Sequence, residues 1–504
     1  MTTKLLAALV LAFAAPLASQ PAHRAAPASA PAIDTMALRA HTYFLTHDLL
    51  EGRGTGRRGN DVAALYLATA TQALGLEGGA GGDYFQNVPL VESVIDTART
   101  RIVVTTDSGP AREFATPAAF VPNVGTTSTL VPFSGELVYV GAARDVLASP
   151  GRLPALAGRV AVVRGPFGPA MAAADTLKAR GATGAVQLTD NADAFLLYVR
   201  SRGPSRMYID PGAHAVSSFI PDIPTVIVGP ELGQALVPDL PAPGTSADHP
   251  FVVTGHRVEL RIAVQPRTFV SRNVAALLPG TGPHRGEYVV FSAHLDHLGI
   301  STPNARGDSI YNGFADNAIG CGMLLTIAEA MARAPRLDRS VLFLFFTGEE
   351  RGLLGSDYFA AHPLVPPESI AAAINLDAGA PPGRPTTWMV AGGDNSTLGA
   401  LAARVAAAAH WKATSVGTSP NSDYFPLLRI GVPAVFLIPA GEAFEGLSAD
   451  SSQVLRRRWG AYHDPADEWT ADFPFAGPAR YAEFAYLVGV AAASGQRQQM
   501  LRTP

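Results

Sequence analysis

Two kinds of pattern alternate along the C-terminal half of the chain. Short, continuous apolar runs, which are typical of strands buried on both faces, occur at 288–293, 341–346, 371–376 and 434–438. Between and after these runs, stretches with helical periodicity occur at about 317–332, 353–361, 396–409 and 477–494. This alternation predicts an α/β domain whose sheet is mostly parallel and is covered by helices on both faces.

The N-terminal half has a different pattern. We expect helices over 34–75, interrupted by a glycine- and arginine-rich loop at 50–56, and then alternating, strand-like residues over 87–106. From about residue 120 onward, strand-like pieces recur with only one helical piece between them, which indicates an inserted β-rich domain. The expected boundaries are therefore 34–119 for the N-terminal part of the main domain, 120–256 for the insertion, and 257–504 for the larger part of the main domain.

The first 33 residues have the pattern of an export signal followed by a leader. Lys4 supplies a positive charge, 5–17 is continuously apolar, and small residues follow near plausible cleavage points. We expect 1–22 to be a signal peptide and 23–33 a disordered leader; a membrane-anchoring helix is the alternative, and the flanking residues favour it less. No later segment has the length and polarity of a membrane span. We expect a secreted or periplasmic protein with no stable membrane span after signal removal.

Composition narrows the chemistry further. The formal net charge is -4 and there is no basic run, so there is no electrostatic case for nucleic acid binding. The single cysteine, Cys321, excludes an intramolecular disulfide and a cysteine-based zinc site, and we expect it to be a small buried hydrophobe. A bound metal would therefore have to be held by His, Asp and Glu.

Acidic and histidine residues stand at the C-terminal ends of nearly all expected core strands, where open α/β sheets place their sites. In chain order they are His294, Asp296, His297, Asp316 (at a helix start), Glu349, Glu350, Asp377 and His463, the last preceded by Tyr462. Each alone has an ordinary explanation, such as a helix N-cap, a solvated turn or a structural histidine. Together, two histidines and three carboxylates suit zinc, and a carboxylate can bridge two zinc ions with its two oxygens.

The segments around these residues resemble the metal motifs of the co-catalytic zinc aminopeptidase family, which includes secreted leucyl aminopeptidases, aminopeptidase Y and the glutamate carboxypeptidases. The matching segments are 292–297 (Ser-Ala-His-Leu-Asp-His), 316–318 (Asp-Asn-Ala), 347–356 (Thr-Gly-Glu-Glu-Arg-Gly-Leu-Leu-Gly-Ser), 375–377 (Asn-Leu-Asp) and 462–467 (Tyr-His-Asp-Pro-Ala-Asp). The resemblance implies a zinc-exopeptidase three-layer sandwich with a mixed, mostly parallel sheet. Residues 136–228 resemble the protease-associated domain that some members carry as an insertion, and the loop 50–56 resembles the start of bacterial members.

The resemblance also implies two Zn²⁺ ions and a ligand for each position. His294 and Asp377 would bind one ion, Glu350 and His463 would bind the other, and Asp316 would bridge them. These roles rest on the match of each position to the family's motifs. Together with the expected export signal, the resemblance implies an exported exopeptidase that removes N-terminal amino acids from peptides with metal-activated water.

Three further residues are implied in the chemistry. Glu349 would be the general base, Asp296 would orient the imidazole of His294 from behind, and Tyr462 would donate a hydrogen bond to the developing oxyanion. We expect His297 to support the ligands or to be structural, and 422–424 to line the substrate pocket or to form a plain turn.

Other functions stay open at this point. They are a carboxypeptidase or dipeptidase of the same family, a glutaminyl cyclase on a related scaffold, and a non-catalytic binding protein that kept the fold. The complete ligand set disfavours the last two. An enzyme that recognises a free amino terminus needs acidic groups near the scissile bond, whereas one that recognises a carboxylate needs Arg or Lys there. Peptide substrates are the expected partners, and the sequence leaves the oligomeric state open.

Overall fold

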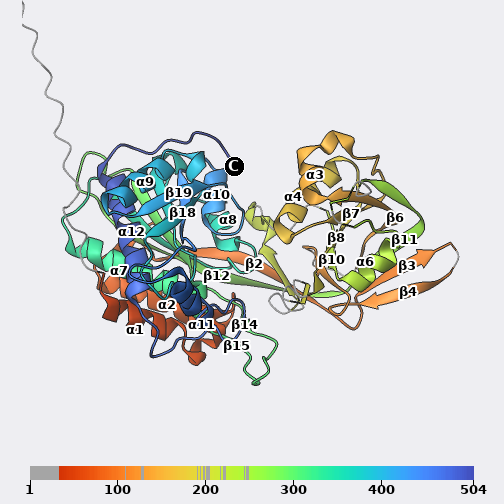
Figure 1. The fold of residues 1–504 in the computed structure, drawn as a ribbon, viewed down its shortest axis with the longest axis horizontal. Helices are drawn as coiled ribbons and strands as arrows, with labels where there is room; N and C mark the ends of the chain where they lie inside the picture. The colour runs from red at the N-terminus through yellow and green to blue at the C-terminus, as the bar shows by residue number, and fades with distance from the viewer. Residues whose placement is uncertain are drawn as a thin grey trace, which may run out of the picture.

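The computed structural model describes residues 33–504 apart from 108, 126–129, 190, 193–194, 197–198, 200–204, 216, 219–222, 243 and 246–248. The expected signal peptide, and all of the expected leader except Ile33, lie outside the described residues. The described chain forms two lobes that are joined by long strands (Figure 1). None of the described helices combines the length and the apolar character that crossing a membrane requires.

The larger lobe is built on a ten-stranded sheet. In spatial order its strands are β19 (Lys412–Val416), β18 (Thr387–Ala391), β20 (Ala434–Pro439), β17 (Ile370–Asn375), β13 (Tyr288–His294), β16 (Ser340–Phe346), β12 (Val264–Leu278), β2 (Phe85–Ile95) and β9 (Ser205–Ile209), with β1 (Glu77–Gly78) paired to β12. The middle strands β20, β17, β13 and β16 are parallel. The prediction of a mixed α/β sheet is confirmed, but one side of the sheet is antiparallel because β12, β2 and β9 extend it there.

Helices cover both faces of this sheet and give it three layers. Alternate residues of β16 face opposite ways, so Phe343 and Phe345 enter one core whereas Leu342 and Leu344 enter the other. The first core is closed by α1 (Thr35–Leu45), α2 (Arg58–Ala73), α7 (Ile319–Arg333), α9 (Leu398–Ala408) and α12 (Ala476–Ser494), and the second by α8 (Leu354–Ala361) and α10 (Tyr424–Arg429). A further helix, α11 (Ala449–Arg458), lies in the long loop after β20 and was not predicted.

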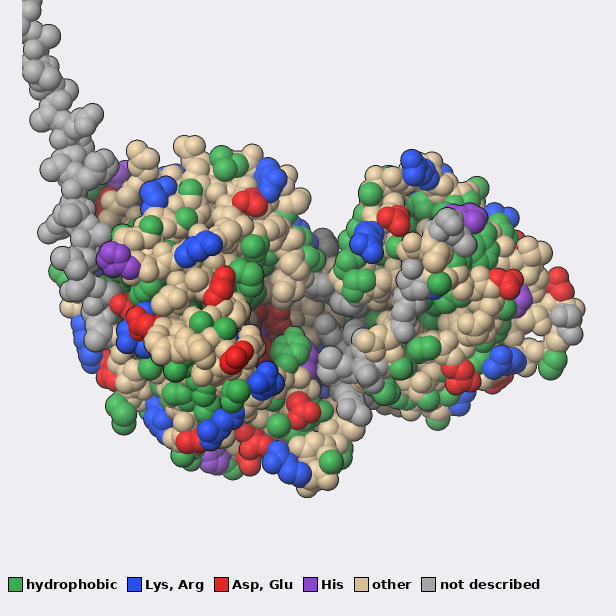
Figure 2. All heavy atoms as spheres, in the orientation of Figure 1, with side chains coloured by type: hydrophobic (Ala, Val, Ile, Leu, Met, Phe, Trp, Pro, Cys, Tyr) green, Lys and Arg blue, Asp and Glu red, His purple; other side chains and the backbone are tan. Residues whose placement is uncertain are grey.

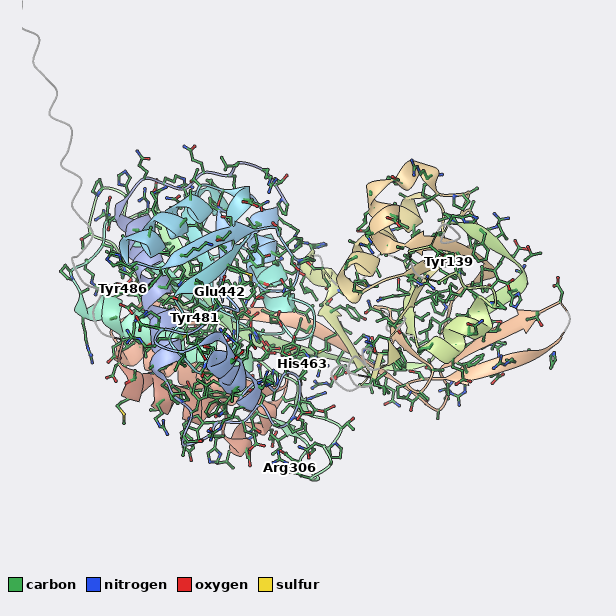
Figure 3. All side chains as sticks on the ribbon, in the orientation of Figure 1. Tyr139, Arg306, Glu442, His463, Tyr481 and Tyr486 are labelled. Atoms are coloured by element: carbon green, nitrogen blue, oxygen red, sulfur yellow. The ribbon has the colours of Figure 1, made fainter. Side chains whose placement is uncertain are left out.

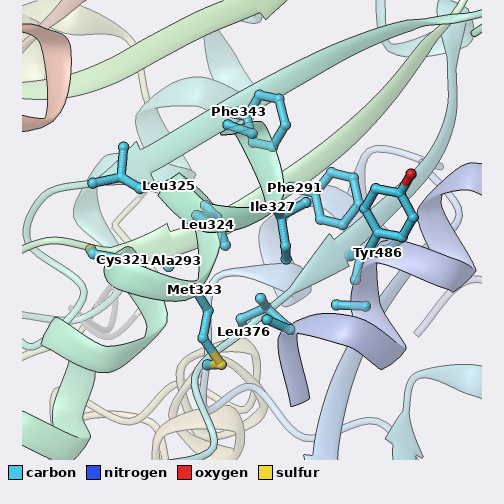
Figure 4. Packing of buried hydrophobic residues seen from close by; sticks show 14 of the residues in the cluster. Phe291, Ala293, Cys321, Met323, Leu324, Leu325, Ile327, Phe343, Leu376 and Tyr486 are labelled. Carbon is cyan, nitrogen blue, oxygen red and sulfur yellow. The ribbon is translucent and has the colours of Figure 1, made fainter. Parts of the chain in front are cut away.

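Aromatic packing fixes the middle of the sheet against α12. The rings of Phe291 and Phe343, on neighbouring strands, stack with centroids 5.6 Å apart (Figure 4). Gly489 of α12 lies directly on Phe291: a Cβ at that glycine would be 2.1 Å from the ring. Cys321 of α7 is buried in the same core, as expected, and its thiol donates to the backbone oxygen of His294 over 3.1 Å. The core therefore reaches the end of β13, where the first candidate ligand stands.

The second lobe has its own eight-stranded sheet. In spatial order its strands are β4 (Gly109–Ala115), β3 (Arg101–Thr106), β11 (Phe251–Ile262), β6 (Leu130–Ala142), β7 (Val160–Arg164), β8 (Gly184–Leu188), β10 (Thr225–Val228) and β5 (Phe120–Asn123), accompanied by α3 (Ala143–Ala148), α4 (Phe167–Ala179) and α6 (Pro230–Leu236). The lobe therefore starts near Arg101 and ends near Ile262, a wider range than the expected 120–256. The alternating stretch at 87–106 is divided between the two sheets by a turn that Asp96 caps, so the start of the second lobe lies within it.

One piece of the insertion returns to the larger lobe. Strand β9, inside the expected insertion, pairs with β2 at the edge of the large sheet. Just after it, the backbone N–H and hydroxyl of Ser218 donate to the buried carboxylate of Asp357 on α8 over 2.6 and 2.7 Å, and Arg429 of α10 binds the same carboxylate at 2.7 Å. The second lobe is thus held to the larger one by β9 as well as by the continuous strands β2 and β12.

Candidate metal centre

The candidate ligands gather beyond the carboxyl ends of the parallel strands. Because β13, β16 and β17 lie side by side in the same direction, the residues that follow them meet at one edge of the sheet. His294 ends β13, Glu350 follows β16, and Asp377 follows β17. Figure 3 places His463 on the side of the larger lobe that faces the second lobe, and Figure 2 shows acidic and histidine atoms recessed on that side.

The first donor group consists of His294, Asp316 and Asp377. The Nε2 atom of His294 lies 2.9 Å from Oδ1 of Asp377 and 3.1 Å from Oδ1 of Asp316. His294 is buried, and the other ring nitrogen, Nδ1, lies 3.2 Å from the backbone oxygen of Asp296. That contact leaves Nε2 to face the two carboxylates, which is the arrangement of a histidine prepared to ligate a metal.

The second donor group uses the other oxygen of Asp316. The Nε2 atom of His463 lies 3.1 Å from Oδ2 of Asp316 and 3.1 Å from Oε2 of Glu350. His297, Asp316 and Glu350 also form a group whose ligand atoms lie within metal-binding reach of one another. Asp316 therefore offers Oδ1 to one group and Oδ2 to the other, which is the geometry that a bridging carboxylate requires.

Asp316 is held by its neighbours in the irregular turn 314–318 before α7. The buried carboxylate of Asp467 accepts hydrogen bonds from the backbone N–H of Ala315 at 2.9 Å and of Asp316 at 3.2 Å. Asn317 donates from Nδ2 to the backbone oxygen of Leu376 over 2.9 Å. This bond ties Asp316 to the segment that carries Asp377, so the two candidate ligands are fixed relative to each other.

The adjacent acids Glu349 and Glu350 lie in different environments. Gly348 has a φ of 70°, in the left-handed region that glycine adopts without strain, and this turn lets the two side chains leave the strand direction. Burial raises the pKa of Glu349 well above its ordinary value. Burial acts on Glu350 in the same sense, but the neighbouring His463 and His297 outweigh it and hold the pKa of Glu350 well below its ordinary range. Opposite shifts in neighbouring carboxyls are a sign of different chemical roles.

Asp296 has a different position from the one we expected. Its carboxylate Oδ1 is 3.8 Å from Nδ1 of His294, so the imidazole is oriented by the backbone oxygen of Asp296 instead. The carboxylate binds elsewhere: Oδ2 accepts from the hydroxyl of Thr55 at 2.8 Å, and Oδ1 accepts from the backbone N–H of Glu349 at 3.1 Å. Asp296 therefore positions the Glu349 turn directly.

Tyr462 lies at the open side of the group. Its ring stacks on that of His463, with centroids 3.9 Å apart and planes inclined by 15°, and the residue is 62% exposed. Partial desolvation, and then the carboxylates of Asp316 and Glu350, raise the pKa of its phenol above the ordinary value. The phenol is thus protonated near neutral pH and remains a hydrogen-bond donor next to the metal ligands.

Residues 422–424 are buried next to the site. The hydroxyl of Ser422 donates to Oδ2 of Asp377, and Asp423 accepts from Ser356 at 2.5 Å. Tyr424 packs in the second core and binds the backbone of Ser419 through its hydroxyl. Ser422 thus supports the candidate ligand Asp377.

The loop 50–56 is the part of the site that pattern reasoning missed. Arg53 is 1% exposed, and its guanidinium donates to the backbone oxygens of Leu295 (3.0 Å), Asn312 (2.6 Å) and Gly313 (2.9 Å), and also to that of Leu45. The first three carbonyls belong to the two segments that carry His294 and Asp316, and that of Leu45 belongs to the end of α1. An arginine within a glycine-rich loop is the only sequence signal of this role, because the partners of Arg53 are backbone oxygens.

The donor set fits zinc. Among the described residues, several buried polar atoms of the site have no aligned hydrogen-bond partner, including Nε2 of His463 and Oε1 of Glu350. Buried polar atoms are normally paired, so their convergence without pairing indicates a cation between them. Nitrogen and carboxylate oxygen donors in groups of three or four are the ligands that zinc takes in proteins.

Comparison with known proteins finds a family match in sequence and similar folds. Residues 273–481 match the model of Peptidase family M28, and this range contains every candidate ligand. The fold is similar to that of an aminopeptidase from Aneurinibacillus sp. strain AM-1, with a TM-score of 0.53 and 18% identity over 94% of this chain and 96% of that one. It is also similar to a zinc aminopeptidase from Bacillus subtilis, with a TM-score of 0.51 and 17% identity over 91% of this chain and 95% of that one. No curated protein matches the chain in sequence.

Proposed function

Because residues 273–481 match the model of Peptidase family M28, we propose that the protein is a zinc-dependent aminopeptidase that removes N-terminal amino acids from peptides. The observation that carries the proposal is that the two carboxylate oxygens of Asp316 belong to different donor groups. One group adds His294 and Asp377, and the other adds Glu350 and His463. These residues would hold two zinc ions.

Bound zinc would supply Lewis-acid polarisation of the scissile carbonyl group and a lowered pKa for water. The chain supplies the proton transfers. Glu349 belongs to neither donor group, stands beside both, and has a pKa raised by burial, so it can accept a proton from the attacking water and return it to the leaving amine. The phenol of Tyr462 can donate a hydrogen bond to the carbonyl oxygen as negative charge develops there.

The charge around the site favours an enzyme that recognises a free amino terminus. Glu349 lies within electrostatic reach of the carboxyl groups of Asp377 and Asp423, which are buried or nearly buried. The guanidinium of the buried Arg53 is engaged by backbone oxygens. A substrate ammonium group would therefore meet acidic groups, which supports the aminopeptidase over the carboxypeptidase.

An assay of the purified protein on amino-acid anilides and on N-blocked and C-blocked peptides tests the proposal. We expect hydrolysis of anilides and of C-blocked peptides, no hydrolysis of N-blocked peptides, loss of activity with a chelator, and recovery when zinc is restored. Release of C-terminal residues from N-blocked peptides would establish a carboxypeptidase instead. Formation of pyroglutamate from peptides that begin with glutamine would establish a glutaminyl cyclase.

We also propose that the protein is exported and that its second lobe corresponds to a protease-associated insertion. Lys4 and the apolar stretch 5–17 support export, and the sheet that β6, β7, β8 and β10 form in parallel supports a compact inserted domain. N-terminal sequencing of the protein from the periplasm or medium of an expressing bacterium should give a start near residue 23. A start at Met1 in the cytoplasmic fraction alone would contradict export.

A further inference from the structure

His297 stands three residues after the first ligand, in a position that immobilises its ring. The residue is 0% exposed, and its backbone N–H donates to the backbone oxygen of Arg53 over 3.2 Å. Gly313, whose φ of 59° lies in the left-handed region, packs against the ring: a Cβ at Gly313 would be 2.5 Å from Cγ of His297. The main chain of His297 is therefore held by Arg53, and its ring packs against the backbone of Gly313.

One nitrogen of this ring, Nδ1, faces the second donor group. Nδ1 lies 2.7 Å from Oε1 of Glu350 and 4.0 Å from Oδ2 of Asp316. Despite the short distance, Nδ1, Nε2 and the Oε1 atom of Glu350 all lack an aligned hydrogen-bond partner. The ring of His463 stands 5.7 Å away and inclined by 63°, so the two imidazoles approach the same carboxylates from different directions. Two polar atoms that are close but not aligned for a hydrogen bond can both bind a metal ion that lies between them.

We propose that His297 is a fourth protein ligand, through Nδ1, of the zinc position formed by Asp316, Glu350 and His463. The inference rests on the proposed zinc site and goes beyond it, because it makes the two positions unequal. The first position has three protein ligands, His294 and the two aspartates, and keeps coordination free for substrate. The second has four, which is the complete set of a tetrahedral zinc. The second position would therefore retain its metal more firmly.

Zinc binding and X-ray absorption of His297→Ala, compared with the unchanged protein, test this inference. In the zinc-loaded protein, three histidines shared between two ions give about 1.5 imidazoles per zinc, and the variant should fall to about 1.0. During graded chelation the unchanged protein should lose its two ions in separate steps. In His297→Ala the second zinc ion should be removed at a chelator concentration at least about 100-fold lower, which is the scale of the affinity lost with a ligand and the residues that orient it. His256→Ala, in the second lobe, is the matched histidine control and should bind zinc as the unchanged protein does.

A second pair of variants separates a ligand from a residue that only orients Glu350. His463→Ala leaves three ligands at the second position if His297 binds the metal, so we expect two zinc ions per chain, and His297→Ala/His463→Ala should hold one. One zinc per chain in His463→Ala, or an unchanged imidazole count in His297→Ala, would overturn the inference. His297→Gln replaces His297→Ala if the alanine variant does not fold. Fewer than two zinc ions in the unchanged protein would instead contradict the proposed metal site itself.

Discussion

Replacing Glu349 by glutamine is expected to lower kcat by about 10²–10⁴-fold while the protein still binds two zinc ions, the range that general acid–base catalysis contributes. The substitution keeps the size of the side chain and removes only the group that accepts the proton. Glu349 is outside both donor groups, and its backbone N–H, bound to Asp296 at 3.1 Å, is unchanged by the substitution. Turnover of an amino-acid anilide and the zinc content of the same sample are the two measurements.

The neighbouring residue supplies the matched control. Glu350→Gln is the same chemical change one position later, but it removes a carboxylate that lies 3.1 Å from His463. We expect this variant to lose activity and to bind the zinc of the second position more weakly, whereas Glu349→Gln loses activity alone. If Glu349→Gln retained near-normal kcat, or weakened zinc binding as Glu350→Gln does, Glu349 would not be the base.

The local sequence was sufficient to predict the ligand edge of the sheet. The apolar runs that became β13, β16, β17 and β20 are buried on both faces, so their pattern has no competing explanation, and their boundaries agree with the structure to within a residue or so. Parallel neighbours necessarily place their carboxyl ends together. The sequence alone did not show how two adjacent acids could enter different environments. The positive φ of Gly348 forms the turn that allows this.

Interactions between distant segments could not be predicted in the same way. The bonds of Arg53 reach carbonyls more than 240 residues away, and backbone acceptors have no sequence signature. Strand β9 joins β2 across more than 100 residues, so its pattern reads as part of the insertion. The carboxylate of Asp296 turns from His294 to Thr55 because the loop 50–56 supplies a donor there. In each case, the contacts of the residue or strand depend on a partner that is distant in the sequence.

Replacing Arg53 by methionine is expected to destabilise the larger lobe by about 4–5 kcal/mol and to weaken zinc binding at both positions. Methionine fills much of the space but donates no hydrogen bond, so the buried carbonyls of Leu295, Asn312, Gly313 and Leu45 lose a donor. An unpaired buried polar group costs roughly 1–3 kcal/mol, and these losses occur together. Urea unfolding of the zinc-free protein measures the stability, and chelator competition measures the zinc affinity.

The zinc measurement separates an effect of Arg53 on the two candidate ligand segments from an effect on stability alone. Arg53→Lys keeps the charge but cannot reach all the carbonyls at once, so we expect it to lie between methionine and the unchanged protein in both measurements. Arg58→Met, the same substitution at an exposed arginine that begins α2, should change stability by less than about 0.5 kcal/mol and leave zinc affinity unchanged. If Arg53→Met lowered stability but left zinc affinity intact, the loop 50–56 would be a structural connection only. A combined loss instead shows that the segments carrying His294 and Asp316 are held in register by one buried side chain.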